Sequence, residues 1–271
     1  MKVTLVPFAG LGNRLNAISS AIALQCAIHC EVSVYWMSSA DCRCQWEDLF
    51  LPIEGITIRP LRQFTLIRRG WEFLGLPQLL RLFLFDGCFK ARKILDSDFL
   101  LRPDCPYKNI YVDANKRFCP LQESSMLCRY YQPTPELEQR IGRVTSQFGD
   151  FTIGVHVRRT DHRTVIAANP LNGFVRLMRE QEQQHPGCTF YLASDDVEVK
   201  RYMEQQFPGR IVTKADVVLQ RDSVEGMKDA VVELFLLART NLIIGSRGST
   251  YSDVASQLYD TPLVFLDEKK L

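Results

Sequence analysis

The first forty residues contain two patterns of apolar positions, continuous runs and a helical repeat. Residues 2–8 (KVTLVPF) and 31–36 are apolar runs that predict strands. Between them, after the turn GLGNRL, apolar residues recur at helical spacing, at Leu15, Ile18, Ile22 and Cys26. A strand, a glycine turn, a helix and a strand in this order predict a βαβ unit, and βαβ units build a parallel sheet.

The same order returns in the second half of the chain. A helix predicted over 135–148 ends at Gly149 and Asp150, and we place a domain boundary there, which gives domains 1–149 and 150–271. The second domain is predicted to alternate strands at 151–157, 189–193, 210–213 and 241–245 with helices at 170–184, 196–206, 225–239 and from 249. The expected fold class is therefore α/β, with two Rossmann-type halves built on parallel sheets.

The stretch from 40 to 130 has no regular pattern, so the N-terminal half is expected to be small and irregular. Its apolar segment 71–89 is broken by Pro77, Arg81 and Asp86 and is too short to span a bilayer. A core helix with solvated ends is the simpler interpretation. The alternative is a peripheral membrane contact through residues 62–93, because basic residues flank the segment at Arg62, Arg68, Arg69, Lys90, Arg92 and Lys93.

Composition and charge exclude several classes of protein. The length of 271 residues suits two domains. The 33 Lys and Arg against 31 Asp and Glu leave a net charge of +2, which argues against a nucleic-acid partner. The nine cysteines are odd in number, scattered and without zinc-finger spacing, so we expect reduced thiols, no metal site and a cytoplasmic protein. With no signal-peptide pattern, the N-terminus is expected to be part of the fold.

Three polar clusters follow predicted strands of the second domain. They are HVRRTDH (156–162), SDD (194–196) and GSRGST (245–250). Ligands of doubly wound sheets bind outside the carboxyl ends of the strands, so we expect these clusters to form one binding site.

Two arginines give the first of these clusters its chemistry. Strand alternation places His156 and Arg158 on one face of the strand and Arg159 on the other. A guanidinium matches phosphate oxygens, so Arg158 and Arg159 predict a clamp for a diphosphate leaving group. A structural pair between an arginine and Asp161 is the alternative.

The other polar residues each allow two interpretations. Ser246, Ser249 and Thr250 suit a phosphate or a ribose, although Ser249 also fits an ordinary helix cap. Glu233 lies on an otherwise apolar helical stripe and needs a donor, either a bound nucleotide or an internal partner such as an arginine. The SDD cluster suggests a metal, but Ser194 or Asp195 is more simply the cap of the next helix.

The N-terminal turn GLGNRL lies between a strand and a helix. Gly10 and Gly12 let a backbone approach a ligand closely, Asn13 and the helix N-terminus offer polar groups, and Arg14 can reach an anion or the other domain. Leu15 stands where a dinucleotide fingerprint has its third glycine, and no P-loop lysine follows, so a plain βα turn is the alternative.

Together, GLGNRL, GVHVRRTDH, LASDD and the run EGMKDAVVELFLLARTNLIIGSRGSTYSDVAS resemble the GDP-fucose-dependent fucosyltransferases of the α1,2, α1,6 and protein O-fucosyltransferase superfamily. The resemblance covers most of residues 150–260 and the first turn. It implies a GT-B-like fold, an N-terminal acceptor side, a C-terminal donor side, inversion at the anomeric carbon and no essential metal. The only small molecule implied is the donor substrate, GDP-fucose, and no cofactor is expected.

The resemblance also implies roles for individual residues. His156 and Arg158 match guanosine and β-phosphate contacts, Arg159 and Asp161 match residues on the fucose and diphosphate side, and Glu233 stands in the place of an aspartate that binds the nucleoside. Ser249 and Thr250 match phosphate contacts, and Asn13 and Arg14 match interdomain contacts of the glycine loop. The predicted donor-binding set is Gly10, Gly12, Asn13, Arg14, His156, Arg158, Arg159, Asp195, Glu233, Ser246, Ser249 and Thr250.

The catalytic residues expected are Arg158 and Asp161. The base is not settled by the resemblance, because His162 replaces a common lysine and Ile166 stands where α1,6 members carry a carboxylate. Asp161 is the nearest candidate in sequence, Asp113 is a weaker one, and a relayed or baseless route is also open.

The expected activity is transfer of fucose to an oligosaccharide, polysaccharide or lipid-linked glycan, at the inner face of a membrane if residues 62–93 bind one. A transferase for another nucleotide sugar and a non-catalytic nucleotide-sugar-binding protein are the alternatives.

Overall fold

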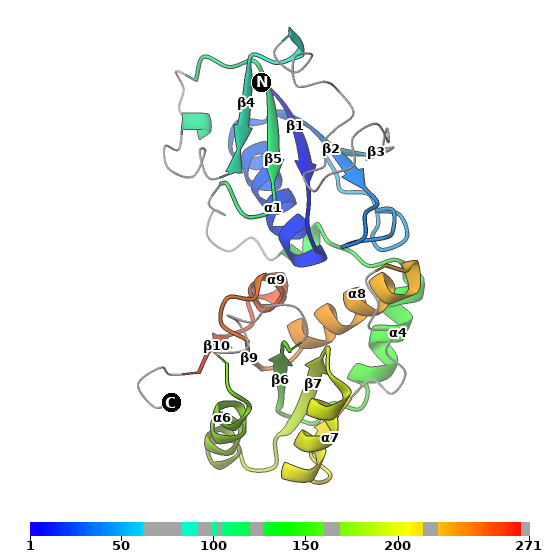
Figure 1. Cartoon of the computed structure of the whole chain (residues 1–271), viewed down its shortest axis with the longest axis vertical. Helices are drawn as coiled ribbons and strands as arrows, with labels where there is room; N and C mark the ends of the chain where they lie inside the picture. The colour runs from blue at the N-terminus through cyan, green and yellow to red at the C-terminus, as the bar shows by residue number, and fades with distance from the viewer. Residues whose placement is uncertain are drawn as a thin grey trace. The chain divides into compact units, whose positions relative to one another are not determined.

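The computed structural model describes residues 1–61, 83–91, 99–101, 105–119, 127–159, 169–213 and 222–266. Its contacts divide the chain into two compact units (Figure 1). The first unit comprises Met1–Ser125, Tyr130–Gln132 and Arg221–Met227. The second comprises Met126–Arg129, Pro133–Gln220 and Lys228–Leu271.

This division lies near residue 130, earlier than the boundary expected at 149. The reason is helix α4 (Pro135–Thr145), which packs in the second unit. Its Arg140 forms an ion pair with the buried Asp229 of helix α8 (Val224–Ala238), and Glu138 binds Arg239 at 2.8 Å. Helix α4 therefore opens the second unit instead of closing the first.

The first unit is built on a five-stranded parallel sheet in the order β3-β2-β1-β5-β4 (Figure 1). The predicted βαβ opening is confirmed as β1 (Lys2–Pro7), α1 (Leu11–Ile28) and β2 (Glu31–Met37). The stretch expected to be irregular contributes the other three strands, β3 (Ile56–Leu61), β4 (Gly87–Lys90) and β5 (Asn109–Ala114), and the short 3-10 helix η1 (Phe99–Leu101).

The second unit carries a second five-stranded parallel sheet in the order β10-β9-β6-β7-β8. Its strands are β6 (Thr152–Val157), β7 (Thr189–Ser194), β8 (Ile211–Val212), β9 (Leu242–Ile244) and β10 (Leu263–Val264). The remaining helices are η2 (Leu127–Arg129), α6 (Leu171–Gln184), α7 (Val197–Gln206) and α9 (Thr250–Tyr259). Numbered within the unit, the strand order is 5-4-1-2-3, which is that of a Rossmann-type sheet. The predicted α/β fold class with two parallel sheets is confirmed, and the first sheet differs in that β5 rather than β4 lies next to β1.

The central strand β6 is buried on both faces, as parallel strands are. Ile153, Val155 and Val157 pack in one core cluster with residues of α6 and α7. On the opposite face, a Cβ added at Gly154 would lie 2.8 Å from Thr240 Oγ1, so only glycine fits there. The strand is thereby held tightly, and its carboxyl end has a fixed position.

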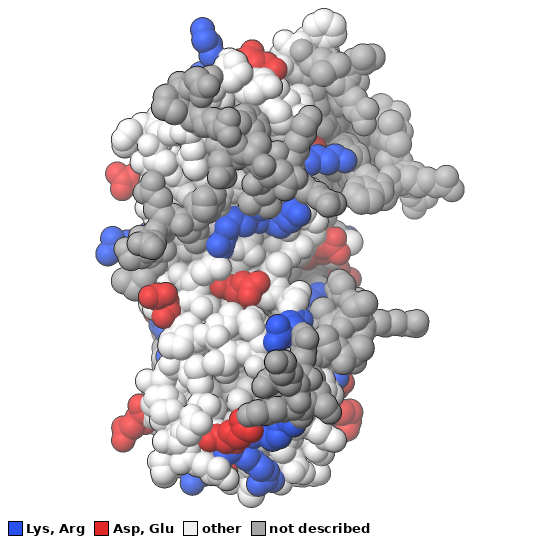
Figure 2. Space-filling model, turned by 90° about the vertical axis from the view of Figure 1, so that its left-hand side faces the viewer, with Lys and Arg blue, Asp and Glu red and all other residues white. Residues whose placement is uncertain are grey.

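Two surface properties bear on the expected partners. Among the described residues, no helix is both long enough and apolar enough to cross a membrane. On the face shown in Figure 2, basic and acidic side chains form small separate groups among uncharged residues. With a net charge of only +2, an anion site has to be built from a local group of residues.

Candidate functional site

The carboxyl end of β6 is fixed by side chains from both neighbouring strands. Ser246, after β9, donates its hydroxyl to the His156 carbonyl at 2.9 Å and accepts from the Arg158 N–H at 3.1 Å. After β7, Asp195 accepts from the Arg159 N–H at 2.7 Å. The backbone from 156 to 159 is therefore held in place, and the fold sets where the two arginine side chains leave the strand. In this structure Ser246 and Asp195 act on that backbone.

His156 lies on the face of β6 opposite the valines, as strand alternation predicts. Its Nδ1 is 2.7 Å from the Ser252 hydroxyl of α9, and its ring centroid is 5.0 Å from that of Tyr251. The residue keeps only 8% of its surface exposed. These contacts fix the plane of the imidazole at the end of the strand.

Arg158 and Arg159 follow directly and are half-buried. Two guanidiniums at this point place positive charge where α/β sheets bind their ligands. Asp161, the predicted base, and His162 fall outside the described residues, so the alternative of a structural pair with Asp161 stays open.

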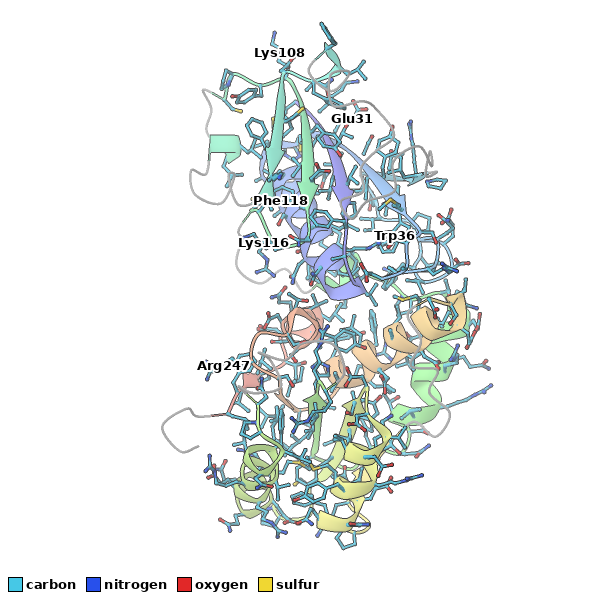
Figure 3. The ribbon with its side chains drawn as sticks, viewed as in Figure 1. Glu31, Trp36, Lys108, Lys116, Phe118 and Arg247 are labelled. Atoms are coloured by element: carbon cyan, nitrogen blue, oxygen red, sulfur yellow. The ribbon has the colours of Figure 1, made fainter. Side chains whose placement is uncertain are left out.

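The turn between β9 and α9 ends at a buried hydroxyl. Gly248 has a φ of +82°, a conformation that favours glycine. Asn169 holds the turn: its side chain accepts from the Arg247 N–H at 2.7 Å and donates to the Arg247 carbonyl at 3.1 Å (Figure 3 labels Arg247). Ser249 is 1% exposed, and its hydroxyl has no hydrogen-bond partner among the described residues. It occupies the cap position of α9 without making the cap bond.

Ser249 and the arginine strand end belong to one cluster. The Ser249 N–H donates to the Ser246 carbonyl at 3.1 Å, and Ser246 binds the backbone of Arg158. Thr250 begins helix α9. The first N–H groups of a helix have no partner within it, so the start of α9, the Ser249 hydroxyl and the positive charge after β6 together form a potential anion site.

The prediction that Ser194 or Asp195 caps the next helix is wrong, because the neighbouring residue makes the cap. The cap of α7 is Asp196, whose carboxylate accepts from the Glu198 N–H at 2.8 Å. Ser194 donates instead to the Val157 carbonyl at 2.8 Å. All three residues of the SDD cluster thus make hydrogen bonds within the fold. Asp196 caps α7, and Ser194 and Asp195 bind the backbone at the end of β6.

Glu233 has an internal partner, which is a lysine rather than the arginine expected. Its Oε1 lies 3.6 Å from Lys200 Nζ of α7, a distance typical of an ion pair and longer than a hydrogen bond. The nearby Tyr191 is fully buried, and its hydroxyl has no partner in the described part of the chain. Burial raises the pKa of Tyr191 well above its usual value, and the charge of Glu233 adds to the rise.

In the first unit, Arg14 is a structural residue. It is fully buried, and Nε donates to the Ala9 carbonyl at 2.7 Å, Nη1 to the Met37 carbonyl and Nη2 to Ser39 Oγ at 2.7 Å. Its guanidinium lies 4.9 Å from the ring centroid of Trp36. Burial is the largest effect on its pKa and lowers it. Arg14 therefore joins the glycine turn after β1 to the end of β2, and the predicted direct contact with an anion has no support in these bonds.

The rest of the glycine turn is more open. The position of a Cβ on Gly10 has no atom of the described residues within 4 Å, whereas Gly12 is buried in the first turn of α1 and Asn13 is half-buried. Ala9 has a φ of +66°, a strained backbone conformation for a residue with a side chain. Asp113, at the end of the neighbouring strand β5, accepts from the Tyr111 hydroxyl at 2.5 Å.

The predicted residues thus form two groups. In the second unit the structure brings together His156, Arg158, Arg159, Asp195, Ser246, Ser249 and Thr250, with Glu233 beside Lys200. In the first unit it brings together Gly10, Gly12, Asn13 and Arg14. Sequence reasoning missed four residues whose roles depend on contacts between distant segments: Asn169, Tyr191, Lys200 and Ser252.

Sequence comparison matches the chain to no protein-family model and to no curated protein. Structural comparison gives matches over nearly the whole chain, and those named below are solved structures of fucosyltransferases. The chain therefore has the fold of this class of glycosyltransferases, in agreement with the resemblance of its motifs.

The individual structures are distant in sequence. Fucosyltransferase NodZ from Bradyrhizobium has a TM-score of 0.70 and 17% identity, covering 99% of this chain and 95% of its own. POFUT1 in complex with GDP has a TM-score of 0.56 and 13% identity, with 98% of both chains covered. A variant of Arabidopsis thaliana FUT1 with GDP has a TM-score of 0.62 and 14% identity, covering 97% of this chain and 69% of its own.

Proposed function

We propose that this chain is a fucosyltransferase that binds GDP-fucose at the carboxyl edge of its second sheet and transfers fucose to a hydroxyl group of a glycan. Its fold is that of NodZ, which has been solved after soaking with GDP-fucose, and of POFUT1 and FUT1, solved with GDP. The motif HVRRTDH and the glycine turn are the residues of this chain that support the same donor.

The observation that carries the proposal is the buried hydroxyl of Ser249, which has no hydrogen-bond partner in the described ranges of the chain. An unsatisfied buried hydroxyl costs about 1–3 kcal/mol, and a ligand that accepts its hydrogen bond removes this cost. A diphosphate fits because the same cluster holds the N-terminus of α9 and the strand end that carries Arg158. The guanosine would then lie toward His156, Tyr191 and Glu233. Arg159 would contact the fucose or the diphosphate next to it.

In the proposed reaction, an oxygen of the acceptor hydroxyl attacks C1 of fucose while the bond from C1 to the diphosphate breaks. Charge moves onto the departing β-phosphate, where Arg158 and the start of α9 stabilise it. These groups supply the positive charge that a metal supplies in other transferases, so we propose a metal-independent reaction. Attack from the face opposite the leaving group gives inversion.

The proton of the acceptor hydroxyl requires a recipient. Asp161 is the proposed base, and Asp113, oriented by Tyr111, is the alternative. A pH profile of transfer by Asp161→Asn and Asp113→Asn variants separates these two carboxylates from a relayed route.

Ser249→Ala is expected to separate binding from stability. Because the buried hydroxyl makes no hydrogen bond within the described part of the chain, its loss should leave stability unchanged or raise it by up to about 1–3 kcal/mol. A hydrogen bond to a charged group is worth about 1.5–3 kcal/mol, so GDP affinity should fall at least about tenfold. Calorimetric titration with GDP and thermal unfolding measure the two effects.

Ser256→Ala on the same helix is the matched control. Ser256 donates to the Thr261 carbonyl at 2.7 Å, so its loss should lower stability by about 1 kcal/mol and leave GDP affinity unchanged. Equal GDP affinities of Ser249→Ala and the wild type would remove Ser249 from the site.

The activity itself is tested by release of GDP from GDP-fucose, with and without a panel of glycans and with EDTA. Transfer to a glycan that continues in EDTA supports the proposal. Binding of GDP-fucose without turnover would favour the non-catalytic alternative, and faster turnover of another nucleotide sugar would replace fucose as the donor sugar.

A peripheral membrane contact through residues 62–93, at the inner face of a membrane, is part of the proposal for a lipid-linked or surface glycan. This stretch carries seven basic and two acidic residues beside its apolar run. Such a composition favours anionic lipid surfaces. Co-sedimentation with phosphatidylserine vesicles should fall when Arg68, Arg69, Arg92 and Lys93 are changed to glutamine, and unchanged binding would contradict the contact.

A further inference from the structure

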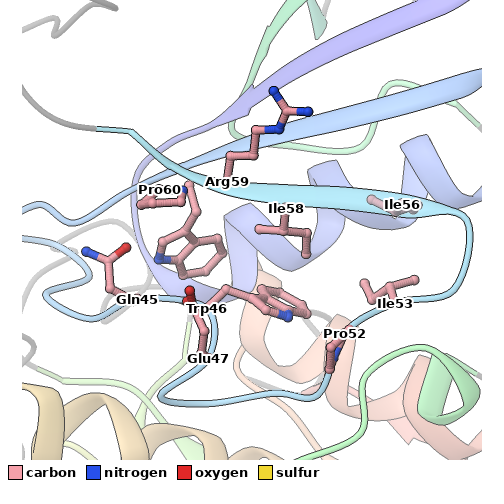
Figure 4. Close-up of a pocket in the computed structure, with 10 residues that line it drawn as sticks. Gln45, Trp46, Glu47, Pro52, Ile53, Ile56, Ile58, Arg59 and Pro60 are labelled. Carbon is pink, nitrogen blue, oxygen red and sulfur yellow. The ribbon is translucent and has the colours of Figure 1, made fainter.

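The first unit contains a cavity of about 240 Å³ beside its edge strand β3 (Figure 4). Residues 38–55 connect β2 to β3 beside it without a crossover helix. Ile56, Ile58 and Pro60 alternate along β3 and line the cavity, and the loop with Trp46 forms the opposite wall. The cavity thus lies between a sheet face and a loop.

The floor of the cavity is rigid and apolar. Trp36 and Trp46 pack edge to face with ring centroids 5.5 Å apart, and they are 0% and 4% exposed. Trp36 Nε1 donates to the Cys44 carbonyl at 2.9 Å, and Trp46 Nε1 donates to the Leu51 carbonyl at 3.1 Å. Both indole N–H groups are used in these bonds and the rings are almost wholly covered, so an occupant would meet the carbon atoms of Pro52, Ile58 and Pro60, which pack around them.

The rim of the cavity is polar and offers hydrogen-bond acceptors. Gln45 Oε1 is buried and has no hydrogen-bond partner among the described residues. Glu47, also at the rim, carries an exposed carboxylate. A buried acceptor without a donor is costly, so this rim favours an occupant that brings hydroxyl groups. The Glu47 carboxylate disfavours a phosphate, and the guanidinium of Arg59, the other charged residue of the lining, points away from the cavity (Figure 4).

The size of the cavity also restricts its occupant. Pockets for drug-sized ligands hold about 300–1,000 Å³, so this one suits a smaller ligand. A pyranose ring has apolar C–H faces that fit a carbon floor, and its hydroxyl groups lie around the ring edge, where they can donate to Gln45 and Glu47. The hydrogen-bond acceptors at the rim match the hydroxyl groups of a pyranose, and the apolar lining matches its C–H faces.

We propose that this cavity binds a neutral pyranose residue of the acceptor glycan. That the pyranose belongs to the acceptor glycan rests on the proposed function. Binding of a pyranose in the cavity rests on the cavity alone. Arg14 lies against the Trp36 ring and donates to the Ala9 carbonyl, so one residue contacts both the cavity wall and the glycine turn.

The direct test is saturation-transfer NMR of the whole chain with the methyl glycosides of glucose, galactose and N-acetylglucosamine. At least one should bind the wild type. Ile58→Phe fills the cavity and should abolish that signal, and Gln45→Ala and Glu47→Gln should weaken binding about tenfold, the loss of one hydrogen bond to a charged or buried group. Thr57→Phe, on the exposed opposite face of β3, is the matched control and should bind as the wild type does.

Kinetics connect the cavity to the reaction. With a glycan that accepts fucose, Gln45→Ala and Glu47→Gln should raise the acceptor KM about tenfold and leave GDP release in the absence of acceptor unchanged. These two variants also serve if Ile58→Phe does not fold. Absence of binding by all three glycosides, or binding that survives every cavity variant, overturns the proposal. Glycoside binding in a protein that ignores GDP-fucose would overturn the acceptor role and the proposed function, but not the pyranose site.

Discussion

Arg158→Ala is expected to lower fucose transfer by about two to three orders of magnitude, the usual loss when one donor to a developing oxyanion is removed. The loss should appear in kcat as well as in kcat/KM, because the charge on the β-phosphate grows during the reaction and is largest near the transition state. The backbone of Arg158 is fixed through Ser246, so the variant should keep its fold. Initial rates and circular dichroism of the same preparation measure both properties.

Arg201→Ala is the control for this variant, since Arg201 is an exposed α7 arginine whose ion pair in the described part of the chain is with Glu198 at 2.7 Å. It removes the same side chain and the same charge from the second unit, and transfer should be unchanged. If Arg158→Ala retained a third or more of wild-type activity, the leaving-group clamp would be wrong.

Arg14→Ala is expected to have the largest effect on stability. The buried guanidinium satisfies two carbonyls and a serine hydroxyl, and hydrogen bonds to charged groups contribute about 1.5–3 kcal/mol each. Its removal takes these donors from the half-buried Ala9 and the buried Met37 and opens a space beside Trp36. A loss of about 3 kcal/mol or more in the stability of the first unit is therefore expected.

Hydrogen exchange is the appropriate measurement, because two units need not unfold in one transition. Protection should fall in β1 and β2 and remain in β6 and β7. Arg59→Ala, which removes an exposed arginine from β3, should leave protection in β1 unchanged. Normal protection of β1 in Arg14→Ala would show that the guanidinium contributes little to the stability of the first unit. The ligand contact that its motif implies would then be the better interpretation of Arg14.

Sequence patterns predicted the regular parts of this fold for physical reasons. The opening βαβ unit and the alternation after residue 149 are continuous apolar segments separated by glycine turns, which is how a buried parallel sheet is encoded. Strands β3 and β4 were missed because they are interrupted or short: ITIRPL contains a proline and GCFK has four residues. Strand β5 (NIYVDA) is as long as β1 and was missed although it is regular. The pairing of β3 with β2, of β5 with β1 and of β4 with β5 depends on tertiary contacts.

The candidate site divides in the same way. That polar residues gather after β6, β7 and β9 follows from the rule for parallel sheets, so the location was predictable. The role of each residue was not, because it depends on which backbone group lies opposite. Asp195 and Asp196 are neighbours with equal chemistry, yet one binds the Arg159 N–H and the other caps α7. Arg14 has the sequence context of a ligand contact and the bonds of a structural residue.

The central claim is that the second unit binds a guanosine diphosphate sugar, and thermal unfolding with GDP, GDP-fucose, GDP-mannose, UDP-glucose or EDTA in parallel tests it most directly. A ligand at one hundred times its Kd stabilises the native state by about 2.7 kcal/mol, which gives a clear rise in the unfolding temperature. The account predicts this rise with GDP and GDP-fucose, a smaller one with GDP-mannose, none with UDP-glucose, and no effect of EDTA. An unfolding temperature that does not respond to either GDP or GDP-fucose, or that rises most with UDP-glucose, would contradict it.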